Sequence, residues 1–209
     1  MEFADVLTRR ASVRNFTEEK VPVDKLREMV RMAGTAPCIG GRETWSFIAV
    51  TNKELMRKMA EAVKMKYDGI IPAGGDHVTD NVRNAVESFS TIFLNAPAVI
   101  AVLSEPYTAV IDKVLEQTSY SHDDINKLRN HPDIQTIGAA IENPLLAAVD
   151  MGYGACWQTG PMVAKEELSK LLGVKEPYSL FAFVAVGKPA HEIKPRVKKP
   201  VGEMFSVIE

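Results

Sequence analysis

The sequence predicts an α/β or α+β domain in which helices cover a small sheet. Three observations lead to this fold class. Short apolar stretches alternate along the chain with segments whose apolar residues recur at helical spacing. Apolar residues make up 46% of the chain and charged residues 25%, as in an ordinary globular protein. The chain of 209 residues has no internal repeat or low-complexity linker and can bury one sizeable core, so we expect a single domain over residues 1–209.

Four short apolar stretches are predicted to be buried strands. They are WSFIAVT (45–51), AVIAVLS (98–104), GACWQTG (154–160) and LFAFVAVG (180–187). Apolar residues at helical spacing predict helices between and before them. These lie within residues 2–9, 21–34, 53–66, 80–97, 135–154 and 165–173, and the fourth is expected to end near Asn95.

The segment 135–154 is the most apolar of the predicted helices. It has little polar face, so we expect it at the centre of the fold or at a subunit interface. Pro144 lies inside it and is expected to kink the helix. Glycine and proline predict loops at 35–44 and 67–80. Residues 105–132 are polar and weakly patterned, and we expect a helix there plus a mobile cover over a site.

Composition excludes several classes of protein. The formal net charge is only −2, which argues against a general nucleic-acid-binding surface. No apolar run reaches the roughly 18 residues that would indicate a membrane span. The first ten residues, MEFADVLTRR, lack the pattern of a signal peptide, and two cysteines make no disulfide framework. We therefore expect a cytoplasmic protein.

Motifs for nucleotide, metal or nucleophile chemistry are weak. GYGACW at 152–157 lacks the third glycine of a dinucleotide fingerprint and follows a helix rather than a strand. The four histidines are scattered, and none stands at metal-ligand spacing from Cys or Asp. There is no GxSxG, and Cys156 in a predicted strand is expected to be a small buried hydrophobe.

A cluster of arginines near the start, RRASVRNF at 9–16, is the strongest local signal. Arg10 and Arg14 are four residues apart, so a helical turn would place them on one side, with Ser12 between them. Planar guanidinium groups, a hydroxyl and backbone donors together can bind a phosphate. The alternative is a solvated helix end, because cations favour helix C-termini. Spacing alone does not decide between the two.

Five stretches in order along the chain resemble the nitroreductase family of FMN-dependent oxidoreductases. They are RRASVRNF, residues 21–51, NAPAVIAVLS, IENPLLAAVDMGYGACWQTG and FAFVAVGKPAHEIKP. The resemblance implies an α+β fold with a small, mostly antiparallel sheet flanked by helices. It also implies an interlocked homodimer around a long central helix, with FMN at the interface. The C-terminal tail, about residues 190–209, is expected to reach the partner subunit.

The resemblance also implies which residues surround the flavin. The group expected at the ribityl phosphate or the pyrimidine edge is Arg10, Ala11, Ser12 and Arg14. The group expected to line the ring from the facing subunit is Pro37, Cys38, Ile39 and Gly41. The group expected against the other side of the ring is Trp157, Gln158, Thr159 and Gly160, with a backbone N–H of Thr159 or Gly160 reaching flavin N5. Lys198 or Arg196 is expected to meet the phosphate. The loop around 67–81, which in the family often gives a polar contact to the flavin, offers Asp76, His77, Asp80 and Asn81 for that role.

The activity that the resemblance implies is a ping-pong reaction without an obligatory acid–base side chain. FMN would take a hydride on N5 from NADH or NADPH and pass it to a nitroaromatic, a quinone or a similar small acceptor. Cys38 and Gly41 stand where the family usually has Ser and Asn, and Glu43–Thr44 replaces Gln–Pro. These departures keep two alternatives open. One is a specialised dehydrogenase or reductive dehalogenase with poor NAD(P)H use, and the other is a flavin-binding protein without turnover.

Overall fold

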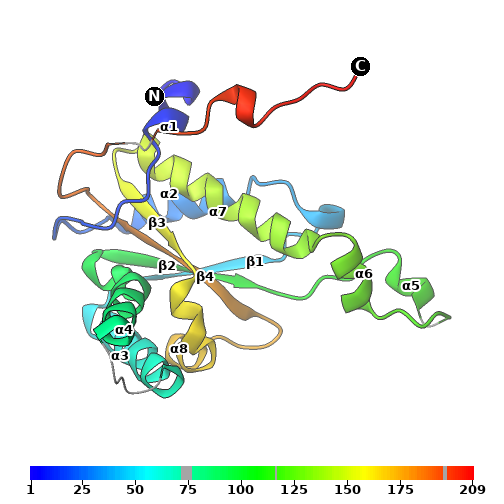
Figure 1. Ribbon diagram of the computed structural model, residues 1–209, viewed down its shortest axis with the longest axis horizontal. Coiled ribbons are helices and arrows are strands. Elements are labelled where there is room, and N and C mark those ends of the chain that lie inside the picture. The colour runs from blue at the N-terminus through cyan, green and yellow to red at the C-terminus, as the bar shows by residue number, and fades with distance from the viewer. Residues whose placement is uncertain (72–76, 116, 195–196) are drawn as a thin grey trace.

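The protein is a four-stranded sheet between two layers of helices (Figure 1). The computed structural model describes residues 1–71, 77–115, 117–194 and 197–209, and for residues 77–79 it describes the backbone only. Neighbouring strands are antiparallel and follow the order β1-β2-β4-β3. The strands are β1 (Trp45–Val50), β2 (Ala98–Ser104), β3 (Gly154–Gln158) and β4 (Ser179–Gly187). All four predicted strands and the predicted fold class are confirmed.

Each face of the sheet carries its own helical layer and its own apolar core (Figure 1). Helices α2 (Val23–Ala33) and α7 (Pro132–Asp150) cover one face, and α3 (Lys53–Ile70), α4 (His77–Ser90) and α8 (Lys165–Leu172) lie on the other. Side chains alternate along the buried strand β2. Ile100 and Val102 face α7, whereas Val99, Ala101 and Leu103 face α3. Both faces of β2 are therefore buried within one subunit.

The loop predicted over 67–80 is wrong at its two ends. Helix α3 continues to Ile70, and α4 already begins at His77. Tyr67 holds the last turn of α3 in place, because its hydroxyl donates to the carbonyl of Gly160 at 3.1 Å and accepts from Ser90 Oγ at 3.0 Å. The helix predicted to reach Asn95 ends earlier, at Ser90, and a 3₁₀ turn follows at Ile92–Asn95.

The central helix α7 begins at Pro132, three residues before the predicted segment. Proline suits the first helical position, where its missing N–H would be unpaired in any case. Pro144 is buried inside the helix, and α7 continues past it to Asp150 without a break. The kink expected at Pro144 stays a prediction. Asn143 fastens this part of α7 to α2 by donating to the carbonyl of Met32 at 3.0 Å.

The residues 105–131, called the arm below, project beyond the end of the sheet (Figure 1). They contain two short helices, α5 (Asp112–Leu115) and α6 (His122–Leu128), where one helix was predicted. None of the helices in the described ranges has the length and apolarity needed to cross a membrane.

The two chain ends leave apolar side chains uncovered. Helix α1 (Phe3–Arg9) buries Val6 but leaves Phe3 68% exposed. Residues 197–209 run away from the body of the subunit, with only a short 3₁₀ turn at Val201–Glu203 (Figure 1). Phe205 and Ile208 in this tail are 67% and 97% exposed. That the tail reaches a partner subunit stays a prediction.

Gly154→Ala tests the close approach of the N-terminal segment to β3. A Cβ on Gly154 would lie 2.6 Å from Val13 Cγ2, so we expect a loss of about 1–3 kcal/mol in the free energy of unfolding. Gly69→Ala is the matched control, because a Cβ there meets open space inside α3 and should stabilise by up to about 1 kcal/mol. Denaturant unfolding at fixed protein concentration measures both. Equal stability of the two variants would contradict the contact.

Candidate functional site

The segment between α1 and α2 pairs with the edge of β3 that β4 leaves open. Ser12 forms an isolated parallel bridge with Ala155, and the N–H of Val13 donates to the carbonyl of Ala155 at 3.0 Å. Gly154 permits this approach, because any side chain there would collide with Val13. Strand β3 is therefore flanked by β4 on one side and by residues 12–13 on the other.

This pairing brings the predicted arginines to β3, although not in the predicted way. Helix α1 ends at Arg9 and Arg10 is extended, so Arg10 and Arg14 share no helical turn. Their internal partners are weak. Arg10 Nε lies 3.6 Å from Glu142 Oε1 on α7, and Arg14 Nη1 donates to the carbonyl of Ser12 at 3.4 Å.

The charges of Arg10 and Arg14 act on the thiol of Cys156 in β3. Burial raises the pKa of the Cys156 thiol, and the positive charges of Arg14 and Arg10 oppose that rise. The thiol is buried, as the sequence predicted. Ala11 is half-buried and Ser12 exposed, so the segment presents two cations and a hydroxyl at the edge of the sheet.

The end of β3, four residues beyond the pairing with Ser12, presents backbone donors. The N–H groups of Thr159 and Gly160 donate to no other group in the described part of the chain. Gly160 is fixed from behind by Tyr67, and a Cβ on it would lie 2.5 Å from Ser90 Oγ. Sequence reasoning missed Tyr67 and Ser90, because both stand far from Gly160 along the chain.

Trp157 and Gln158 point to opposite sides of β3. Trp157 is 37% exposed and lies against α7, 3.7 Å from where a Cβ of Gly138 would stand. Gln158 is buried, and its Oε1 accepts from the N–H of Phe93 at 3.2 Å while its Nε2 has no partner among the described residues. The side chain of Gln158 therefore supports the core, and the exposed groups near it are Trp157 and the following backbone.

The predicted ring-lining residues lie elsewhere in the subunit. Pro37 and Gly41 are exposed, and Cys38 is half-buried against the core between α2 and α7. Ile39–Gly41 forms a 3₁₀ turn near the start of α7, whereas residues 10–14 lie towards its other end (Figure 1). Gly41 has φ +72°, which favours glycine, and a Cβ there would meet open space. A flat ligand can approach this backbone closely.

The other residues predicted to contact the flavin lie in the C-terminal tail and in the 67–81 loop. Lys198 is exposed in the C-terminal tail, and Arg196 lies outside the described residues. Asp76 is also outside them, and the side chain of His77 is not described. Asp80 and Asn81 are exposed at the beginning of α4. Across the described ranges, no three His, Cys, Asp or Glu side chains gather closely enough to hold a metal ion.

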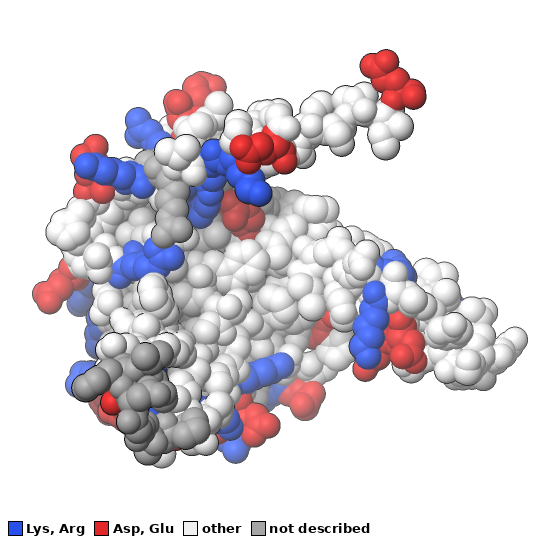
Figure 2. Space-filling model, in the orientation of Figure 1, with Lys and Arg blue, Asp and Glu red and all other residues white. Residues whose placement is uncertain are grey.

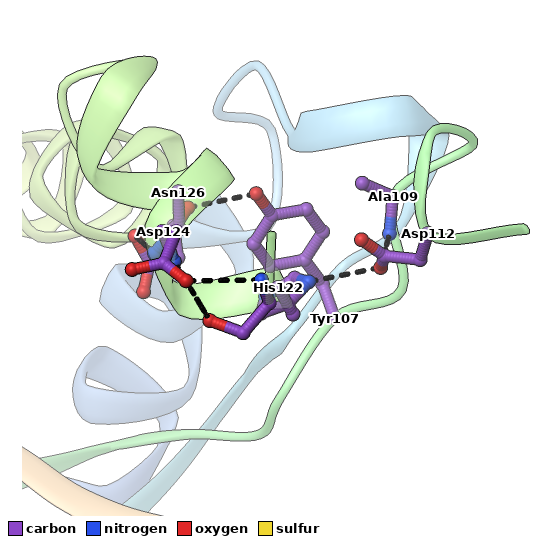
Figure 3. Close-up of polar contacts among 8 residues, drawn as sticks. Tyr107, Ala109, Asp112, His122, Asp124 and Asn126 are labelled. Atoms are coloured by element: carbon purple, nitrogen blue, oxygen red, sulfur yellow. Dashed lines mark hydrogen bonds and ion pairs between the residues drawn. The ribbon is translucent and has the colours of Figure 1, made fainter. Parts of the chain in front are cut away.

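A polar cluster inside the arm holds α5 and α6 together (Figure 3). The hydroxyl of Tyr107 donates to Asn126 Oδ1 at 2.8 Å. Asp112 Oδ2 accepts from the N–H of Ala109 at 2.6 Å and lies 2.9 Å from His122 Nδ1. The ring of His122 meets the ring of Tyr107 edge-on, with centroids 4.9 Å apart. The arm therefore has a defined internal structure beside the 39–42 turn.

Two sequence relatives show what the chain is similar to. A protein of Archaeoglobus fulgidus, provisionally named NADH dehydrogenase/NAD(P)H nitroreductase, is 27% identical over 90% of this chain and 84% of its own length. The iodotyrosine deiodinase of Hydra vulgaris is 26% identical over 94% of this chain and 69% of its own length.

Solved structures and a family model agree with these relatives. A BluB-like flavoprotein from Clostridium difficile has a TM-score of 0.90 and 31% identity over the full length of both chains. A nitroreductase with bound FMN from Desulfitobacterium hafniense has a TM-score of 0.73 and 22% identity, and covers 100% of this chain and 99% of its own. The model of the Nitroreductase family matches residues 7–188. Because that model covers most of the 209 residues, the chain belongs to the nitroreductase family.

Proposed function

We propose that the chain is an FMN-dependent oxidoreductase, acting as a homodimer, that transfers hydride from NADH or NADPH to a nitroaromatic, a quinone or a similar small acceptor. The observation that carries this proposal is the edge of β3. There Ser12 pairs with Ala155 near the start of β3 between Arg10 and Arg14, and at the end of the same strand the N–H groups of Thr159 and Gly160 donate to no group in the described part of the chain. The FMN in the solved nitroreductase of Desulfitobacterium hafniense supports the choice of cofactor.

The arginines suit the phosphate of FMN. A phosphate monoester carries close to two negative charges near neutral pH and accepts several hydrogen bonds. Among the residues that the structure describes, the side chains of Arg10 and Arg14 make only long polar contacts, so binding an anion breaks no strong ion pair there. Ser12 adds a hydroxyl between them, and charge-assisted hydrogen bonds of this kind are the stronger class.

The end of β3 suits the flavin ring. Bound FMN supplies the redox chemistry, and the protein supplies binding, orientation and electrostatics. Tyr67 and Ser90 hold the backbone at Gly160, so the donors of Thr159 and Gly160 are fixed before a ligand arrives. No side chain is assigned here to proton transfer.

The separation of the two halves of the site supports a dimer. Residues 37–41 lie near one end of α7 and residues 10–14 towards the other (Figure 1), so both can meet one ring only across a subunit interface. Figure 2 shows a face with few charges between the C-terminal tail and the arm. The exposed apolar side chains of Phe3, Phe205 and Ile208 are further surface that a second copy would cover.

A second candidate is a reductive dehalogenase or a dehydrogenase of one metabolite, with poor NAD(P)H use. The deiodinase of Hydra vulgaris among the relatives favours it, as do Cys38, Gly41 and Glu43 at positions where the family usually has other residues. A flavin-binding protein without turnover is the third candidate. The three share the flavin site and differ in what reduces and reoxidises the cofactor.

The flavin spectrum separates the three candidates. We expect yellow protein that releases FMN on denaturation, because the phosphate and ring sites are both present. Anaerobic NADH or NADPH should bleach the absorbance, and a quinone or nitroaromatic should restore it. Bleaching by dithionite alone, followed by reoxidation with a halogenated aromatic, would favour the dehalogenase. A colourless protein that ignores added FMN would reject all three.

Arg14→Ala tests the phosphate site. Loss of one charge-assisted hydrogen bond should weaken FMN binding by about 1.5–3 kcal/mol, measured by fluorescence titration of the flavin-free protein. Arg9→Ala is the matched control, because Arg9 is an exposed cation at the end of α1 with no ion pair inside the described ranges. Equal affinities of the two variants would remove Arg14 from the site.

Hybrid dimers test whether one site uses both subunits. Arg14→Ala removes a phosphate contact, and Gly41→Val places a β-branched residue at φ +72° in the ring-lining turn. Each homodimer should retain little FMN. A hybrid purified through two different tags should recover half of the sites, because both lesions then fall in the same one. A hybrid as empty as its parents would mean that each subunit builds its own site.

A further inference from the structure

A cavity of about 670 Å³ opens between the 39–42 turn and the arm. Ile39 and Tyr107 supply apolar wall, and three cationic residues, Arg42, Lys113 and Arg129, line it as well. No acidic residue of the described chain lines it. The cavity is therefore lined by three positive charges, although the chain as a whole has a net charge of −2.

These three cations have no ion-pair partner among the residues that the structure describes. Two carboxylates act on Tyr107, those of Asp112 in the arm and Asp133 in α7, and each accepts hydrogen bonds. Asp112 is bonded by His122 and the N–H of Ala109, and Asp133 Oδ1 accepts from Asn126 at 2.9 Å. Like charges around a shared cavity repel one another, and a bound anion relieves that repulsion.

The hydrogen bonds of the polar cluster (Figure 3) join the segments of the arm that carry Lys113 and Arg129. The Asp112–His122 contact ties α5, which carries Lys113, to the start of α6. The Tyr107–Asn126 bond ties α6, which ends next to Arg129, to the strand side of the arm. Burial raises the pKa of the Tyr107 hydroxyl, the charge of Arg129 opposes that rise, and the carboxylates of Asp133 and Asp112 add to it.

We propose that the cavity binds the electron acceptor through an anionic group, such as a carboxylate, held by Arg42, Lys113 and Arg129. This inference rests on the proposed function, because Ile39 joins the cavity to the turn expected to line the flavin ring. The acceptor is then an aromatic or similarly flat anion whose apolar part lies towards Ile39. The three cations are specificity-determining residues, and they take no part in the redox chemistry.

A charged and a neutral acceptor of the same nucleus test this. The measured quantity is the second-order rate constant with which the acceptor reoxidises the pre-reduced protein. For 4-nitrobenzoate, Arg129→Gln should lower this rate constant by about threefold to tenfold. For methyl 4-nitrobenzoate the rate should not change. Lys127→Gln is the matched control, because Lys127 is an exposed cation of α6 outside the cavity lining. Arg129→Lys should restore part of the preference.

Binding to the oxidised protein gives a second readout without turnover. Ligand-observed NMR should show a dissociation constant for 4-nitrobenzoate that rises about threefold to tenfold in Arg129→Gln but not in Lys127→Gln. Added salt should narrow the difference, because the cations are exposed and screened. A protein without flavin would fail the proposed function, yet this titration would still report on the cations.

Two outcomes would overturn the inference. Equal losses for the charged and the neutral acceptor would show that Arg129 acts on the shape of the arm rather than on an anion. A ping-pong reaction allows its two half-reactions to be measured separately. If Arg129→Gln slowed only the reduction of the flavin by NADH or NADPH, the cations would instead bind the phosphates of the electron donor.

Discussion

The close contact between residues 12–13 and β3 is the constraint on which the rest of the candidate site depends. The segment from Arg10 to Pro22 has no regular helix or strand of its own, so its order comes from the bond of Val13 to Ala155 and from the pairing of residues 15–17 with residues 188–190. Gly154 makes the bond possible by leaving room for the Val13 side chain. Arg10 and Arg14 are thereby brought to the edge of β3, the strand whose other end carries the backbone donors of Thr159 and Gly160.

The sequence predicted the elements whose signal is local and failed where distant contacts decide. The strands were found because each is a short apolar run, and α8 because its periodicity ends at a glycine in the left-handed conformation. The last turn of α3 was missed, because Gly69 and Pro72 signal a loop. What holds that turn is the bond from Tyr67 to Gly160, whose partner lies 93 residues away along the chain and leaves no local pattern.

The candidate site was predictable only in part for the same reason. Spacing singled out Arg10 and Arg14 but invoked a helical turn that does not exist, because Arg10 is already extended. Their place beside β3 follows from a pairing between segments far apart in the sequence. Arg42, Lys113 and Arg129 gave no sequence signal at all, because each is an isolated cation that becomes part of a cluster only when the arm folds against the 39–42 turn.

Acidic and basic residues nearly balance over the whole chain, which has a net charge of −2, but they do not balance in each region of the surface. Cations without strong partners gather at the edge of β3 and at the arm cavity, and in the proposed dimer both clusters would face one flavin. Screening limits an exposed charge to about 8 Å at physiological ionic strength, so each cluster acts on its own anion. Glu43 does not reverse this at the cavity, because Arg42 lines it and Glu43 does not. The proposed acceptor therefore meets a positive wall despite the acidic residue beside Arg42.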